Sequence, residues 1–133
     1  MNEHEQAFGQ AFIQPDRRER YLTALANPAR RSAFHRELHH PKSNFLMAEY
    51  VEPIIPSEHY TEHYTKLLAP KLKKLGAPLE CWVFGNYIDM RQMNLSEALD
   101  ALIGMRSGTI VSCLPGKLAF LESEDHRIIL RNS

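Results

Sequence analysis

The segment from residue 108 to residue 120, which reads GTIVSCLPGKLAF, constrains the fold most, because it predicts a tight turn between two strands. Pro115 presets φ at the first central position of such a turn, and Gly116 accepts the positive φ that a type II turn needs at the second. A polar segment after residue 122 then separates the second of these strands from a further β-type run. The chain is therefore expected to end in a three-stranded meander of residues 109–114, 117–122 and 127–131.

Prolines mark the start of two helices near the N-terminus. Pro15 suits the first turn of a helix over residues 15–26, and Asn27 with Pro28 predicts a capped second helix that ends near residue 39. Two short helices with this punctuation indicate an αα-hairpin. Its apolar positions, including Tyr21 and Phe34, are expected to face the core.

The middle of the chain adds a third helix, a strand and a crossover helix. Ser57 is a suitable cap for a helix over residues 58–75, and residues 79–87 form a β-type run rich in aromatic residues. A helix from about Asn94 to Ile103 then joins this strand to the meander, as in a βαβ crossover. The predicted fold class is α+β: three N-terminal helices, then a four-stranded mixed sheet with one crossover helix and a C-terminal β-meander.

Length and composition predict one domain. The 133 residues include 44% apolar and 24% charged residues, which is ordinary for a globular protein. We expect residues 1–14 to be a flexible N-terminal arm and residues 15–133 to be a single α+β domain. The first residues are polar, without a secretory signal, and no apolar run is long enough to span a bilayer, so a cytoplasmic location without membrane contact is predicted. The part from residue 79 onward resembles small bacterial single-domain proteins without an assigned activity, and this resemblance transfers no residue role.

Positive charge is concentrated on the predicted helical hairpin although the whole chain has a formal net charge of zero. Between residues 15 and 42, seven Lys or Arg residues stand against three acidic ones. Guanidinium groups bind carboxylates and phosphates in a bidentate manner, so this face is a candidate for binding a protein partner or phosphate. The alternative is an ordinary solvated helix face. The candidate binding residues are Arg17, Arg18, Arg20, Arg30, Arg31 and Arg36.

His59 and His63 form the second candidate site. They are four residues apart in the sequence EHYTEHYT, a spacing that lets two imidazoles on one helical face share a metal ion. The HExxH pattern is absent, and the sequence identifies no third ligand. The alternative is a solvated helix face. Cys81 and Cys113 lie in strand-like runs and are expected to be buried free thiols.

These features favour a small cytoplasmic, non-enzymatic interaction module that binds another macromolecule, as an adaptor, accessory subunit or toxin-neutralising protein. No complete catalytic constellation is visible, although an enzyme is not ruled out, and no cofactor is expected. The first alternative is a nucleic-acid-associated protein that uses the basic hairpin. The second is a metal-dependent hydrolase built on His59 and His63. The oligomeric state is not predicted.

Overall fold

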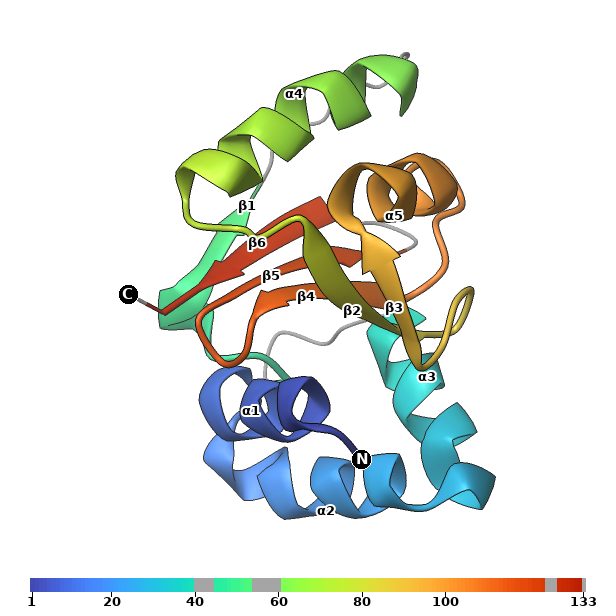
Figure 1. Cartoon of the computed structure of the whole chain (residues 1–133). Coiled ribbons are helices and arrows are strands. Elements are labelled where there is room, and N and C mark those ends of the chain that lie inside the picture. The colour runs from blue at the N-terminus through green and yellow to red at the C-terminus, as the bar shows by residue number, and fades with distance from the viewer. Residues whose placement is uncertain (40–44, 54–60, 124–126, 133) are drawn as a thin grey trace.

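The computed structural model describes residues 1–39, 45–53, 61–123 and 127–132 and shows an α+β domain in three layers (Figure 1). A six-stranded sheet lies between two helical layers. The helices are α1 (Glu3–Phe12), α2 (Pro15–Ala26), α3 (Arg31–His39), α4 (Thr61–Lys74) and α5 (Leu95–Leu102), with 3-10 turns η1 (Pro28–Arg30) and η2 (Ala48–Tyr50). The strands are β1 (Val51–Pro53), β2 (Glu80–Gly85), β3 (Arg91–Asn94), β4 (Thr109–Leu114), β5 (Leu118–Glu122) and β6 (Arg127–Arg131).

The predicted C-terminal meander is confirmed. Strands β4, β5 and β6 are consecutive antiparallel neighbours in the sheet. The turn between β4 and β5 is closed by a hydrogen bond from the Lys117 amide to the Leu114 carbonyl at 2.9 Å. Gly116 has the positive φ that the sequence predicts, at 71°. The structure therefore builds the end of the chain as expected.

The prediction of a four-stranded mixed sheet is wrong. The strand order is β1-β6-β5-β4-β2-β3, and every neighbouring pair is antiparallel. The crossover prediction fails because β3 follows β2 as a hairpin and reverses the chain before α5 begins. The chain then returns along β4 antiparallel to β2. Strands β1 and β3 are short and polar or proline-containing, as edge strands often are, so their sequences carry little β signal.

Residues 1–14, expected to be a flexible arm, instead form α1 and pack against the sheet. Asn2 caps this helix by accepting a hydrogen bond from the Glu5 amide at 3.0 Å. Phe8 and Phe12 are fully buried, since their rings fill the space between α1 and the strands. Burial of these two aromatic side chains therefore holds the segment on the sheet.

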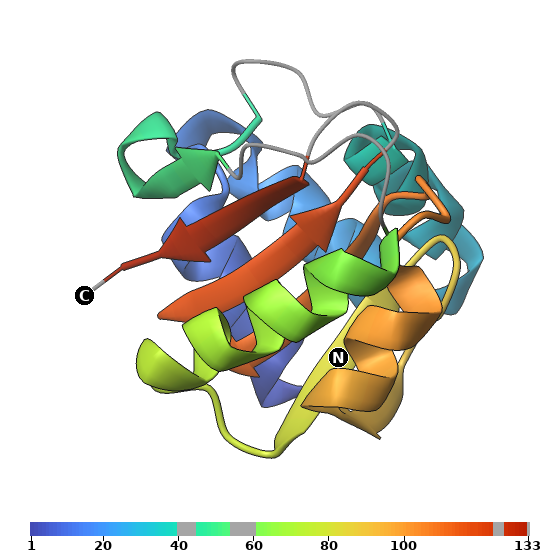
Figure 2. The ribbon, with the colours of Figure 1, turned by 90° about the horizontal axis from the view of Figure 1, so that it is seen from above.

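Each face of the sheet has its own core. Helices α1 and α3 lie against one face with α2 outside them (Figure 1), and α4 and α5 lie side by side across the other (Figure 2). Because both faces are covered, β5 is buried along its whole length rather than alternating between buried and exposed residues. The core on the α1–α3 side contains the aromatic residues Phe8, Phe12, Tyr21, Phe34, Phe45 and Phe84. The core on the α4–α5 side is mainly aliphatic and includes Leu68, Leu72, Val83, Leu99, Leu102 and Val111.

Candidate functional site

The αα-hairpin predicted from the sequence is present as α2 and α3. Pro15 occupies the first turn of α2, and the Asn27 side chain caps the following 3-10 turn by accepting from the Ala29 amide at 3.0 Å. The inner faces meet through Tyr21 and Phe34, whose rings cross edge to face with centroids 5.2 Å apart. These two rings are core residues, as predicted, and leave the outer faces of the hairpin for polar residues.

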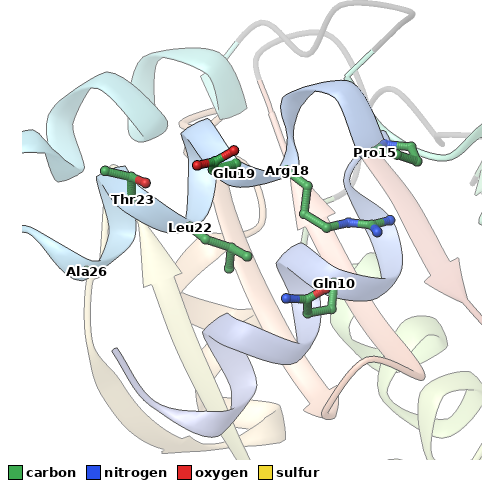
Figure 3. A pocket seen from close by; sticks show the side chains of 7 residues that line it. All are labelled: Gln10, Pro15, Arg18, Glu19, Leu22, Thr23 and Ala26. Carbon is green, nitrogen blue, oxygen red and sulfur yellow. The ribbon is translucent and has the colours of Figure 1, made fainter.

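Of the six candidate arginines, Arg18 and Arg31 make contacts inside the protein. Arg18 donates to the Gly9 and Ile13 carbonyls at 3.0 and 3.1 Å, and so satisfies the C-terminal end of α1. Figure 3 shows this side chain in a hollow between α1 and α2, beside Leu22 and facing Gln10. Because its guanidinium is hydrogen-bonded to the end of α1, we assign Arg18 a structural role at the contact between α1 and α2.

Arg31 is the centre of a buried polar cluster, which we call the Arg31 cluster: Glu5, Arg31, Asp89 and Trp82. The Arg31 guanidinium is 2.7 Å from a carboxylate oxygen of Glu5 and 2.7 Å from one of Asp89. It also donates to the Leu25 carbonyl at 2.9 Å. The Trp82 indole donates to the second Glu5 oxygen at 2.7 Å. This cluster joins α1, α3, β2 and the loop after β2.

Electrostatics hold Arg31 and Asp89 of this cluster in their ionised forms. Burial alone would lower the pKa of Arg31, but hydrogen bonds from its guanidinium to Asp89 and Glu5 outweigh burial and raise it. Burial alone would raise the pKa of Asp89, yet hydrogen bonding to His35 and Arg31 and the charge of Arg31 hold it well below 3.8. With Arg31 only 4% exposed, its charge is satisfied within the fold and does not face a partner.

The remaining arginines differ in exposure. Arg17 is half-buried, whereas Arg20, Arg30 and Arg36 are exposed. Two adjoining hollows between α2 and α3, which we treat together as one groove, share Arg20; Arg30 lines one of them and Arg36 the other. The groove has a small-residue wall made of Ala24 and Ala33, and acidic side chains also line it. Its charged residues are Asp16, Glu19, Arg20, Arg30, Arg36 and Glu37.

Glu37 also interacts with Tyr21 on the inner side of this groove. Burial raises the pKa of the Tyr21 hydroxyl, and the negative charge of Glu37, to which that hydroxyl is hydrogen-bonded, adds to the effect. Tyr21 therefore stays neutral and acts as a donor to Glu37. The groove is a surface of fixed charges around small apolar residues, and it can form ion pairs with a ligand.

Within the residues that it describes, the structure does not bring the two candidate histidines together with other metal ligands. His59 lies outside the described residues, and His63 falls in α4 at a position whose side chain is not described. Among the described residues, no group of three or more His, Cys, Asp or Glu side chains is placed to hold a metal ion. The metal-site hypothesis therefore stays a prediction.

Three residues of the Arg31 cluster were missed by sequence reasoning. Glu5 is 77 residues from Trp82, and Arg31 is 26 residues from Glu5 and 58 from Asp89, so no local spacing relates them. A further contact of this kind joins His4 on α1 to Ser112 on β4, with 2.7 Å between Nδ1 and Oγ. Burial lowers the pKa of His4, so the imidazole in this contact stays neutral near pH 7.

Comparison of the chain with protein-family models, curated proteins and solved structures gave no match, so its function has to be argued from its own residues. None of the helices in the described ranges combines the length and apolar composition needed to cross a membrane.

Proposed function

We propose that the protein is a small cytoplasmic, non-enzymatic interaction module whose α2–α3 groove binds a segment of another protein. The observation that carries this proposal is the exposure of Arg20, Arg30 and Arg36 along one groove, while Arg18 and Arg31 are used by the fold. Exposed arginines on a preformed surface can form bidentate ion pairs with carboxylates without rearrangement of the chain. The partner segment is expected to present acidic side chains to them.

The mixture of charges favours a protein partner over nucleic acid. Asp16, Glu19 and Glu37 line the same groove and would repel a phosphate backbone. A protein segment can match both signs, and the small side chains of Ala24 and Ala33 allow it to approach the helices closely. Nucleic-acid association remains the alternative, and it predicts an affinity that falls steeply as salt is raised.

The test is affinity capture from a lysate of the native host, run with and without nuclease, using three versions of the chain. The first is the wild type and the second carries Arg20→Glu, Arg30→Glu and Arg36→Glu. The third is a matched control with Lys66→Glu, Lys71→Glu and Lys73→Glu, which reverses the same number of exposed charges on the other helical layer. Circular dichroism melts of all three check that the fold is retained.

The proposal predicts a stoichiometric protein that is captured by the wild type and the lysine variant and is lost with the arginine variant. Equal capture by all three versions would show that the groove is not the binding surface. Material that disappears on nuclease treatment would replace the proposal by the nucleic-acid alternative.

A further inference from the structure

Cys81 and Cys113 lie opposite each other on neighbouring antiparallel strands. The register pairs Trp82 with Ser112 and Val83 with Val111, and one step further along β2 and β4 places Cys81 across from Cys113. Both side chains belong to the core beneath α4 and α5, where they are 2% and 1% exposed. Both are free thiols, and the Cys81 and Cys113 thiols donate to the Pro78 and Val111 carbonyls, each at 3.9 Å. The two thiols are also close enough to perturb each other's pKa.

This arrangement is close to the geometry of a disulfide. Directly opposed residues of an antiparallel pair have Cα atoms about 4.5–5.5 Å apart. A disulfide takes Cα separations of about 4.4–6.8 Å. On its other side Cys113 lies in an irregularity of the β4–β5 ladder, between the pairs Ser112–Ala119 and Leu114–Leu118. The backbone at Cys113 can therefore adjust without breaking a regular pair.

We propose that Cys81 and Cys113 are a redox modification site, at which a hydroperoxide converts the two thiols to an intramolecular disulfide that thiol reductants reverse. The inference is independent of the partner-binding groove. The surroundings favour this product over binding of a soft metal ion. A disulfide is neutral and suits an apolar core, whereas a monovalent soft metal ion held by two thiolates would bury a net negative charge, and a divalent one would lack further protein ligands. Among the described residues, the cluster around the pair consists of hydrophobic side chains, and no group of three or more His, Cys, Asp or Glu is placed to hold a metal ion.

The chemistry needs one equivalent of peroxide. The Cys81 thiolate attacks the terminal peroxide oxygen, so that a sulfur–oxygen bond forms, the oxygen–oxygen bond breaks, and water or an alcohol leaves with a proton. The Cys113 sulfur then attacks the Cys81 sulfur, and the resulting sulfenic oxygen leaves as water with the Cys113 proton. The two sulfurs together lose two electrons, and the peroxide gains them.

Access from solvent favours Cys81 as the attacking sulfur, and the direction of the pKa shifts agrees with it. The Cys113 thiol lowers the pKa of Cys81, whereas the Cys81 thiol, with burial, raises the pKa of Cys113. Cys81 is also the nearer of the two to a solvent-facing segment. Its sulfur is 3.9 Å from the Pro78 carbonyl, in the loop between α4 and β2, and Pro78 and Leu79 are exposed. A local opening of that loop brings peroxide to Cys81 first.

A disulfide here would be reported by the residues next to the two cysteines. Trp82 is the single tryptophan of the chain, follows Cys81 and binds Glu5 of α1. Ser112 precedes Cys113 and binds His4 of α1. The thiol pair thus lies in the two strands whose opposite face anchors α1, and the fluorescence of Trp82 gives a readout independent of mass.

The experiment exposes the folded chain to hydrogen peroxide, quenches it, denatures it and alkylates the remaining thiols. Peptide mass spectrometry then identifies a Cys81–Cys113 crosslink. The expected result is a crosslink in most chains, a change in Trp82 fluorescence, a rise of about 5–10 °C in the unfolding midpoint, and reversal of all three by dithiothreitol. The controls are Cys81→Ala and Cys113→Ala, with Cys81→Ser and Cys113→Ser as replacements if either fails to fold. A chain with one cysteine cannot form the intramolecular bond.

Three results would overturn the proposal. Both cysteines remain alkylatable after peroxide has fully oxidised an unstructured cysteine peptide in the same tube. A disulfide-linked dimer forms in place of the intramolecular bond. One cysteine is driven to sulfinic acid while the other stays a thiol.

Discussion

The two helical layers contact the same sheet, but they are held to it by different forces. On the α4–α5 side the contact is mainly aliphatic. The buried carboxylate there, Glu122, forms its ion pair within the sheet, with Arg127 of β6, and accepts from the Gly104 amide at 2.7 Å in the turn just after α5. On the α1–α3 side, aromatic rings surround the Arg31 cluster, whose members come from distant parts of the chain.

This contrast explains how the N-terminal layer acquires a defined orientation. Burial of apolar side chains is non-directional, so by itself it fixes the presence of a helix on the sheet better than its position. Hydrogen-bonded ion pairs are directional, and an Arg31 cluster with misplaced members would leave a buried charge unpaired. We infer that the Arg31 cluster sets the position of α1 and α3, and therefore of the groove on their outer side.

The largest expected effect comes from removing the centre of the Arg31 cluster. Arg31→Ala leaves the buried Glu5 carboxyl without its main partner, so the free energy of unfolding should fall by about 3–5 kcal/mol in urea titrations. The neighbouring and exposed Arg30 is the matched control, and Arg30→Ala should change it by less than about 0.5 kcal/mol. Equal effects of the two substitutions would show that the cluster contributes little to docking of the layer.

The corresponding change in the other layer is a cavity. Leu99 of α5 is fully buried, so Leu99→Ala should lower the free energy of unfolding by about 2–4 kcal/mol. Leu67 of α4 is 69% exposed and serves as control, with a change below about 0.5 kcal/mol for Leu67→Ala. Hydrogen exchange should show weakened protection first in α4 and α5 after Leu99→Ala, and first in α1–α3 after Arg31→Ala. The reverse assignment would contradict the separation of the two layers.

Asp89 should make the stability of the folded protein depend on pH in the acid range. Its pKa is held below 3.8 in the folded protein, so the folded state binds this proton less readily than the unfolded chain does. The stabilisation is fully present above pH 3.8 and is lost as pH falls below it. Asp89→Asn should remove about 1–3 kcal/mol at pH 7 and flatten the decline of stability on acidification. An unchanged acid profile in urea titrations across this range would exclude Asp89 as its source.

The smallest effect is expected at the contact between His4 and Ser112. Ser112→Ala removes the hydroxyl that binds the imidazole and should lower the free energy of unfolding by about 1 kcal/mol. Ser32 of α3 is exposed, and Ser32→Ala is the control with little expected change. If the two substitutions have the same effect, the contact does not help to fix α1.

How far the sequence predicted the fold depended on whether a signal was local. The turn at Pro115 and Gly116 and the caps of the αα-hairpin are local, and the structure has them. Strand β3 has the sequence RQMN, which carries little β preference, and it forms through pairing with β2 that no local rule reveals. Without β3, the sequence analysis predicted a parallel crossover from β2 to β4. The structure instead has a β2–β3 hairpin, after which β4 runs antiparallel to β2.

The candidate site shows the same limit for side chains. The sequence grouped six arginines by charge and proximity, but it could not show that Arg31 points inward. Its partners Glu5 and Asp89 are 26 and 58 residues away along the chain. An arginine at a helix position beside apolar neighbours gives the same pattern whether it is paired in the core or solvated on the surface. Burial and partners separate the two cases, and both are tertiary properties.

The central claim is that the inner arginine holds the fold while the outer arginines bind a partner. It is tested most directly by measuring stability and nuclease-resistant partner capture together, for Arg31→Ala and for the variant with Arg20→Glu, Arg30→Glu and Arg36→Glu. We predict a large loss of stability for the first variant. For the second we predict a fold of nearly unchanged stability that no longer captures the partner. A triple variant that still captures the partner at wild-type level, beside an Arg31→Ala chain of unchanged stability, would contradict the account.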